Sequence, residues 1–276
     1  MDNKSDPEAN NNMNHQKTKE AEEASKQQMK SKVLDLISIF LAELIGTALL
    51  VFFGCMGCID NSDMGMTNNL FQISVVFGLV IMFIVQIFGC VSGAHLNPAV
   101  TVAAVVYKLL TPAVAIGYCV AQLLGAFIGY GLLKVLVASD VMTNANNVGL
   151  CVTHVHSSIS TVQGTFIELI GTGTLIWIVC GVWDPRNAKG HDAVPLKLGL
   201  AITALCGCFG HWTGCSMNPA RSFGPALWNM DWGQHWVYWI GPLAGGLLAS
   251  LSYRHVFYRK PVEIDEKRRM EEMALN

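Results

Sequence analysis

Between residues 33 and 258 the sequence consists of long apolar segments that carry almost no charged side chains. Only 14% of the whole chain is charged, whereas soluble domains carry about 25%. A helix that crosses a hydrocarbon core needs about 20 mostly apolar residues, because its backbone polar groups must be paired within the segment. The sequence therefore predicts an all-α membrane protein, flanked by polar tails at residues 1–32 and 259–276.

Six of the apolar segments have the character of membrane spans, although the fifth is short for one. They run roughly over Val33–Ile59, Leu70–Val91, Pro112–Ala138, Thr161–Trp183, Leu198–Trp212 and His235–Tyr258. Two further apolar stretches, Pro98–Tyr107 and Pro219–Trp228, have about ten residues each. Because they are too short to span, we expect two re-entrant half-helices, each buried within the protein.

Lysine and arginine are distributed unevenly among the linkers. Residues 60–69 and 139–160 contain neither, whereas the linker after the fourth span carries Arg186, Lys189 and Lys197. The tendency of basic residues to remain in the cytoplasm then places both termini there, in a multi-pass protein of the cell membrane. The N-terminal tail lacks the apolar core of a signal peptide, so we expect residues 1–32 to be a disordered cytoplasmic tail. Residues 259–276 are expected to form a second cytoplasmic tail.

The sequence contains an internal repeat. Glu-Leu-Ile-Gly-Thr occurs at Glu43–Thr47 and again at Glu168–Thr172, 125 positions later. Asn-Pro-Ala occurs at residues 97–99 and again at residues 218–220, 121 positions later. The apolar region over residues 33–258 therefore divides into homologous halves at about 33–138 and 161–258. Each half has three spans, an odd number, so the second half is inverted, and inverted repeats place a binding or conducting site at the midplane.

Each Asn-Pro-Ala motif has the signature of a helix start. Asn97 and Asn218 suit the N-cap, and Pro98 and Pro219 suit the first helical position, followed by Ala99 and Ala220. Inversion brings the two N-termini together, and each carries about half a positive charge. Each asparagine can cap its helix with its oxygen and still offer N–H donors. Such a site favours a neutral molecule with lone pairs, repels cations and interrupts proton transfer along a file of water, which is the known logic of proton-excluding pores.

These motifs resemble the aquaporin (major intrinsic protein) family. The resemblance rests on SGAHLNPAVT at Ser92–Thr101, TGCSMNPARSFGPA at Thr213–Ala226, the paired ELIGT segments and HWVYWIGPLAGG at His235–Gly246, and it covers about residues 33–258. It implies a right-handed bundle of six transmembrane helices and two half-helices. It also implies a homotetramer with one pore per subunit, in contact with membrane lipid, that passively conducts water and small uncharged solutes.

The resemblance also assigns a selectivity filter to Phe77, Cys206, Cys215 and Arg221. Arg221 is expected at the narrowest constriction, near the outer mouth, because an arginine inside a membrane is costly and marks function. Water-selective members carry histidine where this chain has Cys206, so the missing imidazole predicts a wider constriction that passes glycerol or urea. In this departure the chain resembles the insect entomoglyceroporins. Ser222, where bacterial-type glycerol channels carry aspartate, nevertheless fits the water-channel pattern.

Three polar residues, two within the predicted spans and one beside the first Asn-Pro-Ala motif, have alternative interpretations. Glu43 and Glu168 could form a proton relay, but the resemblance implies that they hydrogen-bond the loops carrying the Asn-Pro-Ala motifs. His95 could be a satisfied core residue, whereas its place in the motif implies that it lines the inner vestibule of the pore.

Other classes of function are disfavoured by the sequence. The nine cysteines lie mostly in apolar runs, which argues against a disulfide framework, and Cys55-x-x-Cys58 is expected to be a pair of packed thiols rather than a metal site. We expect no cofactor, no metal and no nucleic-acid partner, and we find no catalytic constellation that indicates an enzyme. An ion channel would need rings of charge that are missing. The alternatives that stay open are a strictly water-selective aquaporin and a low-flux junctional protein on the same fold.

Overall fold

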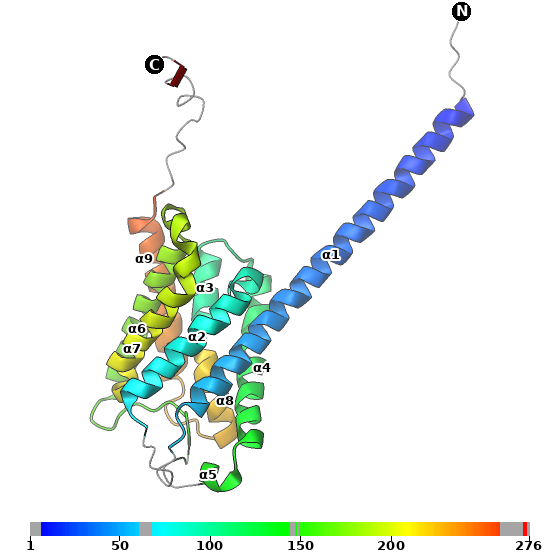
Figure 1. Ribbon diagram of the computed structural model, residues 1–276. Coiled ribbons are helices and arrows are strands. Elements are labelled where there is room, and N and C mark those ends of the chain that lie inside the picture. Colours follow the sequence, from blue (N-terminus) through cyan, green and yellow to red (C-terminus); the bar gives the residue numbers. More distant parts are fainter. Residues whose placement is uncertain (1–6, 61–67, 144–146, 148, 260–272, 275–276) are drawn as a thin grey trace, which may run out of the picture.

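The computed structural model describes residues 7–60, 68–143, 147, 149–259 and 273–274. The described residues form helices joined by loops and contain no strand. Figure 1 shows a bundle in which the helices cross one another and α1 extends well beyond the rest. The elements are α1 (Pro7–Met56), α2 (Leu70–Ser92), α3 (Pro98–Val106), α4 (Pro112–Leu136), α5 (Ser139–Thr143), α6 (Thr161–Trp183), η3 (Pro185–Ala193), α7 (Val194–Thr213), α8 (Pro219–Asn229), α9 (Val237–Ser252) and η4 (Tyr253–Phe257).

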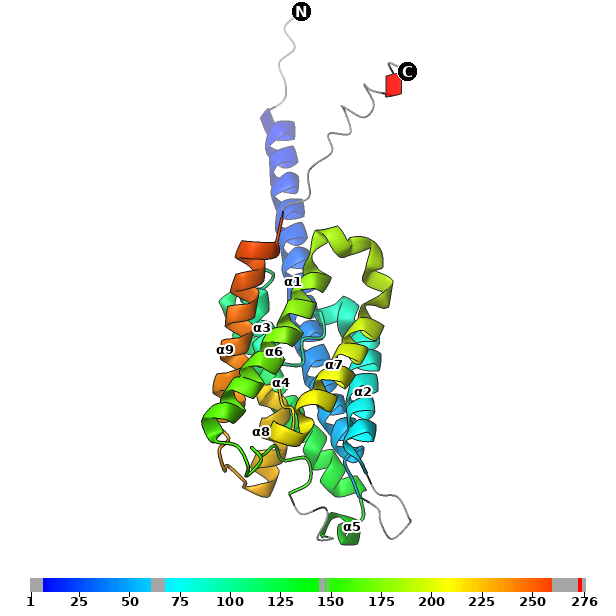
Figure 2. The same ribbon diagram turned by 90° about the vertical axis from the view of Figure 1, so that its left-hand side faces the viewer.

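Five described helices are long and apolar enough to cross a membrane: α1 from Glu22 onward, α2, α4, α6 and α7. The sixth predicted span corresponds to α9, which has 16 residues and continues directly into the five-residue η4. Figure 2 shows α9 running beside α6 along the height of the bundle. The predicted fold class is therefore confirmed. The fifth span is longer than expected, because α7 begins at Val194 with Pro195 in its first turn, a position where the missing N–H costs nothing.

The two halves of the chain pack in the same way. In the first half α1 packs against α4, and in the second half α6 packs against α9, while α2 and α7 pair across the halves. Gly125 of α4 lies against the Leu44 carbonyl of α1, and Gly245 of α9 lies against the Leu169 carbonyl of α6. A Cβ atom at either glycine would collide with that backbone. Small residues thus let both helix pairs approach closely, as membrane helices often do.

The short helices α3 and α8 lie inside the bundle (Figures 1 and 2). α3 packs mainly against α9, and α8 packs mainly against α4. We call the end of the bundle from which α1 projects and at which η4 lies the termini face, and the end near α5 the opposite face. α3 extends toward the termini face and α8 toward the opposite face, so their N-terminal ends meet in the middle of the bundle (Figure 2).

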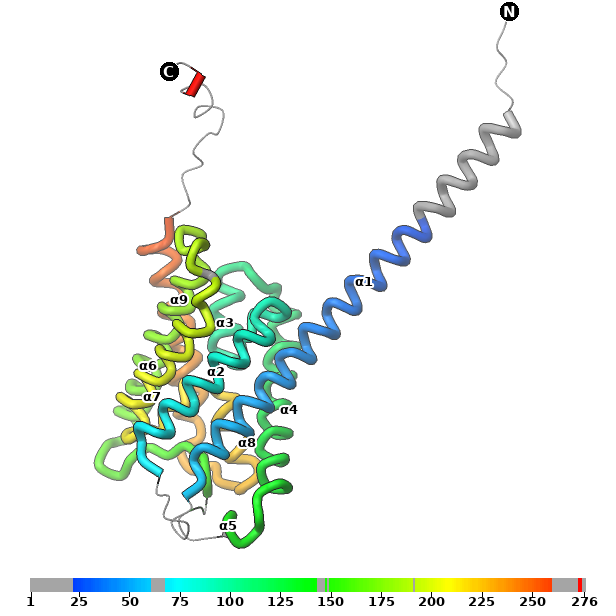
Figure 3. The backbone as a smooth tube through the Cα atoms, in the orientation of Figure 1, coloured from blue at the N-terminus to red at the C-terminus, as the bar shows by residue number. Residues whose placement is uncertain are grey.

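The N-terminal segment differs from the expectation of a disordered tail over residues 1–32. A single helix, α1, runs from Pro7 to Met56, and its coloured part in Figure 3 extends beyond the neighbouring helices. Residues 22–32 are rich in Glu, Lys and Gln, which favour helices, and a helix nucleated by the span extends at little cost. Most of the tail expected over 259–276 lies outside the described residues, as do residues 1–6.

Candidate functional site

The two Asn-Pro-Ala motifs start the two half-helices, as their sequence predicts. Asn97 is the N-cap of α3, and its Oδ1 accepts from the backbone N–H of Ala99 at 2.8 Å. Asn218 is the N-cap of α8, and its Oδ1 accepts from Ala220 at 3.0 Å and from Arg221 at 3.3 Å. The side-chain oxygen of each asparagine therefore pairs backbone donors that the helix itself leaves free.

Hydrogen bonds between the halves join the two motifs. Nδ2 of Asn97 donates to the carbonyl oxygen of Met217 at 2.8 Å, and Nδ2 of Asn218 donates to that of Leu96 at 2.7 Å. Each asparagine thus binds the residue immediately before the other asparagine. Because an amide group has two N–H donors, each asparagine keeps one beyond this contact.

Two buried carboxylates hold the loops that lead into the half-helices. The carboxylate of Glu43 accepts from Ser92 Oγ at 2.6 Å, from the backbone N–H of His95 at 2.9 Å and of Leu96 at 2.8 Å, and from Gln122 Nε2 at 2.8 Å. This set of donors satisfies both oxygens, which lowers the cost of burying an acid.

Glu168 makes the equivalent contacts in the second half. Its carboxylate accepts from Thr213 Oγ1 at 2.6 Å and from the backbone N–H of Ser216 at 2.9 Å and of Met217 at 2.7 Å. A buried tyrosine closes each loop from the other side, Tyr118 donating to the Ser92 carbonyl and Tyr238 to the Thr213 carbonyl. The repeat seen in the sequence is thus a repeat of hydrogen bonds.

The same loops hold strained backbone in both halves. Ala94 and Leu96 have φ of 46° and 55°, and Cys215 and Met217 have φ of 45° and 50°. Such left-handed conformations cost a non-glycine residue about 1–3 kcal/mol and persist where the surroundings determine them. The N–H groups of Leu96 and Met217 donate to the two carboxylates, and those of Ala94 and Cys215 donate to the hydroxyls of Ser92 and Thr213. These hydrogen bonds supply that constraint.

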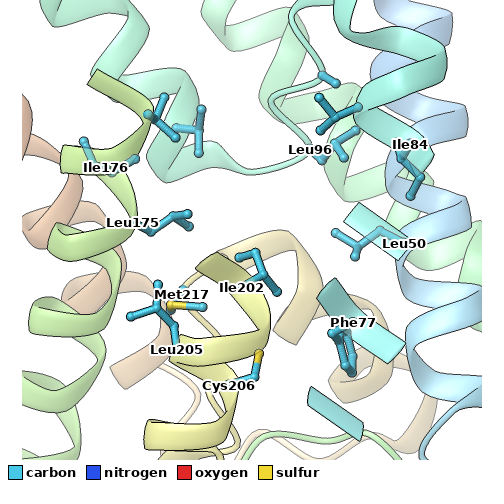
Figure 4. Packing of buried hydrophobic residues seen from close by; sticks show 14 of the residues in the cluster. Leu50, Phe77, Ile84, Leu96, Leu175, Ile176, Ile202, Leu205, Cys206 and Met217 are labelled. Carbon is cyan, nitrogen blue, oxygen red and sulfur yellow. The ribbon is translucent and has the colours of Figure 1, made fainter. Parts of the chain in front are cut away.

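A cavity of about 610 Å³ runs past both motifs. All four predicted filter residues line it, together with Asn97, Asn218 and His95. The guanidinium carbon of Arg221 lies 5.1 Å from the ring centroid of Phe77, and Arg221 is only 7% exposed. In Figure 4 the side chains of Ile202 and Cys206 lie between those of Leu175 and Phe77, within one apolar cluster. Aromatic, thiol and guanidinium groups therefore line the same cavity.

His95 also lines this cavity. Its Nδ1 is 3.3 Å from Thr101 Oγ1, and its ring centroid is 5.0 Å from that of Tyr118 and 5.9 Å from that of Trp183. The histidine is therefore both packed and cavity-lining, and its place in the inner vestibule of a pore stays a prediction.

The expectation for Cys55 was wrong. Cys55 forms a disulfide with Cys151, which lies in the loop before α6, while Cys58 remains a free thiol. The two cysteines are 96 positions apart in the chain. The number of cysteines and their apolar surroundings indicate a class of protein, but they do not identify which two thiols meet in space. The described residues contain no cluster of three or more potential metal ligands from His, Cys, Asp and Glu.

The loop that holds Cys151 contacts Arg221 of the cavity wall, which the sequence did not indicate. Nη1 of Arg221 donates to the Cys151 carbonyl oxygen at 2.7 Å, and Nη2 lies 3.5 Å from its sulfur. Farther along the loop, Thr153 Oγ1 is 2.8 Å from Ser222 Oγ. No local motif marks these residues, because their partners lie about 70 positions away in the chain.

A charged contact stabilises the termini face, just beyond the end of α6. Asp184 accepts from Arg186 Nε at 2.9 Å and from Tyr253 Oη at 3.3 Å, and Arg186 also donates to the Phe257 carbonyl at 2.9 Å. The hydrogen bonds from Arg186 hold the pKa of Asp184 below its usual value, outweighing the opposite effect of burial. This contact ties the linker after α6 to η4.

Comparisons with known proteins agree with this geometry. The family model described as Major intrinsic protein matches residues 30–253. The chain is 37% identical over 234 residues to mouse Aquaporin-4, covering 84% of this chain and 70% of that protein. Over 201 residues it is 40% identical to rat Aquaporin-4, covering 72% of this chain and 59% of that protein.

A second named relative and a solved structure match a larger share of their own length. Sheep Aquaporin-2 is 39% identical over 229 residues, which cover 82% of this chain and 81% of that protein. The X-ray structure of the aquaglyceroporin from Plasmodium falciparum superposes with a TM-score of 0.71 at 26% identity, covering 80% of this chain and 96% of that one. The chain therefore belongs to the major intrinsic protein, or aquaporin, family of membrane channels, which are transporters rather than enzymes.

Proposed function

We propose that the protein is a passive channel for water and for small uncharged solutes such as glycerol and urea. The observation that carries this proposal is the composition of one stretch of cavity wall, where Cys206 lies with Phe77, Cys215 and Arg221. The resemblance puts an imidazole at the Cys206 position of water-selective members. A thiol is smaller and less polar, so the constriction is wider and admits a polyol. The matched solved structure is titled an aquaglyceroporin, in keeping with such a solute.

Exclusion of protons and ions follows from the two asparagines. Each has its oxygen turned toward its own helix and an N–H donor left for the cavity that it lines. A water molecule between two such donors turns its oxygen toward both and cannot accept a proton from its neighbour. The positive ends of α3 and α8, together with Arg221, repel cations in the same region.

The disulfide supports a membrane orientation with both termini in the cytoplasm. Disulfides persist in oxidising compartments, and Cys55 and Cys151 join at the opposite face. Arg186 and Lys197 lie in or beside η3, at the termini face, in agreement with the distribution of basic residues. We infer a multi-pass protein of the cell membrane.

We also infer a homotetramer. Several large apolar side chains are about half exposed in the single chain. Leu79 is 51% exposed, Leu132 45% and Phe166 59%, and lipid or neighbouring subunits must cover them. Native mass spectrometry from lipid nanodiscs tests this assembly. A mass of one or two chains would overturn it.

Flux in proteoliposomes tests the solute range. Osmotic water flux and glycerol flux are compared for the native chain and for Cys206→His. We expect the native channel to conduct both, and the histidine variant to keep its water flux while losing glycerol flux severalfold. Water flux alone in the native protein would make it a strictly water-selective channel. Negligible flux of both in correctly folded protein would favour a junctional role.

A further inference from the structure

The Cys55–Cys151 disulfide joins the end of the first span to a loop that contacts Arg221, a residue of the cavity wall. Cys55 lies in the last turn of α1 and is fully buried. Cys151 lies between α5 and α6, and its carbonyl oxygen accepts a hydrogen bond from Arg221, which lines the cavity. The disulfide is therefore a covalent connection between the scaffold of the bundle and a residue that touches Arg221.

Cys151 contacts Arg221 through two of its atoms. Its carbonyl oxygen accepts from Nη1 at 2.7 Å, and its sulfur, the one engaged in the disulfide, lies 3.5 Å from Nη2. The same guanidinium faces the ring of Phe77 at 5.1 Å. The position of Cys151 therefore sets where the guanidinium lies relative to the aromatic wall, which decides the free width between them.

The backbone at Cys151 is not in a conformation that a cysteine favours by itself. Its φ is 66°, in the left-handed region, and it lies two residues after Gly149, whose φ is 69°. A non-glycine residue stays in that region only where its surroundings impose it. Apart from the disulfide and the contact with Arg221, the neighbouring hydrogen bonds run from Tyr130 Oη to the Leu150 carbonyl at 2.8 Å, from Leu150 N to the Asn147 carbonyl at 3.0 Å and from Val152 N to the Gly149 carbonyl at 3.0 Å.

We propose that the Cys55–Cys151 disulfide is a specificity-determining element of this channel, which positions the Cys151 carbonyl and through it the Arg221 guanidinium. Both cysteines are positioning residues, because their effect on a permeant acts through Arg221. Without the disulfide the loop relaxes, Arg221 loses its fixed acceptor and the constriction widens. This inference rests on the proposed channel function, and it concerns the ratio of solute to water permeability rather than conduction itself.

Substitution of one disulfide cysteine tests the proposal in proteoliposomes. For Cys55→Ser we expect the ratio of glycerol to water permeability to rise severalfold, and erythritol, a larger polyol, to become measurably permeant. A purely structural role would lower water and solute flux in proportion and leave the ratio unchanged. Cys208→Ser is the control, because Cys208 is a free thiol that lies exposed on α7 and outside the cavity lining.

The Arg221→Ala background tests whether the effect passes through Arg221. There we expect Cys55→Ser to change the permeability ratio no further, since the guanidinium that the disulfide positions has gone. A second increase of the same size would overturn the proposal. So would an unchanged ratio in a Cys55→Ser channel that keeps its water flux.

The native channel, reduced after reconstitution, makes the same comparison on a chain that is already folded. Tris(2-carboxyethyl)phosphine breaks the S–S bond: the phosphorus gives up two electrons and gains an oxygen from water, and the two hydrogens of that water leave as the protons of two thiols. Reduction is continued until two additional thiols per chain are counted. We expect the glycerol-to-water ratio to rise as in Cys55→Ser, and an unchanged ratio overturns the proposal.

The outcomes separate this inference from the proposed solute range. If the native channel conducts water alone, the proposal of glycerol permeability fails, and a gain of glycerol flux in Cys55→Ser still supports the disulfide's role. If the native channel conducts glycerol and the disulfide variants keep the native ratio, the solute range stands and this inference fails.

Discussion

The side-chain amide of Asn218 donates a 2.7 Å hydrogen bond to the carbonyl oxygen of Leu96, 122 positions earlier in the chain. The reciprocal bond from Asn97 to Met217 is 2.8 Å long. The two inverted halves are thus joined by side chains whose oxygens cap the half-helices and whose nitrogens bridge between them. One residue type performs both tasks because an amide is an acceptor and a donor at once.

Asn218→Ala removes the cap and the bridge together. The lost cap costs about 1 kcal/mol and the lost hydrogen bond a similar amount, so the unfolding temperature in detergent should fall. The proton permeability of proteoliposomes should rise relative to water permeability, because one of the two orienting donors has gone. Asn187→Ala is a control, since Asn187 bonds the Gly181 carbonyl and both residues are outside the cavity lining. Equal unfolding temperatures for Asn218→Ala and the native chain would contradict this account.

Glu168→Gln should destabilise the loop before α8. Glutamine keeps one oxygen acceptor, but its NH2 group replaces the second oxygen. That NH2 group faces donors from which the carboxylate accepts hydrogen bonds in the native chain, such as the Met217 N–H. A buried donor without an acceptor costs about 1–3 kcal/mol, and the strained backbone at Met217 loses its constraint.

The measurement for Glu168→Gln is thermal unfolding together with both fluxes. We expect a lower unfolding temperature and water and glycerol fluxes that fall in the same proportion, since the fraction of folded channels decreases. A changed ratio at unchanged stability would instead indicate a direct role in selectivity. Glu168→Asp, with a shorter side chain and the charge retained, should be intermediate.

A mercurial should block the channel through thiols in the cavity. Cys206 and Cys215 both line the cavity and are free, and mercury bound to a thiol there obstructs the path. We expect mercuric chloride to lower native water flux severalfold and the Cys206→Ser/Cys215→Ser variant to lose most of that block, with any remainder assigned to Cys90, a third free thiol of the lining. Cys208→Ser is the control, because Cys208 lies exposed on α7 and outside the cavity lining. Full block of the double variant would mean that another site is responsible.

Acidification should weaken the contact between Asp184 and Arg186. The pKa of Asp184 is lower in the folded chain than its ordinary value because of the hydrogen bonds from Arg186. Its stabilisation is therefore fully present above the unfolded pKa of about 3.9 and is lost as the pH falls through the folded value.

Unfolding temperatures of the native chain and Asp184→Asn, measured between pH 8 and pH 3, test this expectation. The native chain should be slightly more stable by a constant amount down to about pH 5, and the difference should vanish at lower pH. The effect should be small, because Arg186 is 44% exposed and solvent screens the pair. A difference that grows on acidification has the wrong sign for this contact.

Much of the fold followed from local properties of the sequence. The length of the apolar runs determines which segments can span, and Asn-Pro at residues 97–98 and 218–219 determines where the half-helices begin, because cap and proline act within one turn. The matching motifs at Glu43 and Glu168 indicate an inverted repeat from the spacing of residues along the chain alone. The length of α1 was misjudged, since polar helix formers continue a helix that an apolar span has already nucleated.

By itself the sequence determined the spans, the two half-helix starts and the inversion that makes them meet, because these depend on spacing along the chain. Only the tertiary structure decided which thiol pairs with Cys55 and which carbonyl accepts from Arg221. Both relationships join segments that are about 70 to 100 positions apart, and they depend on where a loop comes to rest on the finished bundle. No periodicity or local propensity carries that information, because a contact between distant segments is formed only when the helices between them have packed.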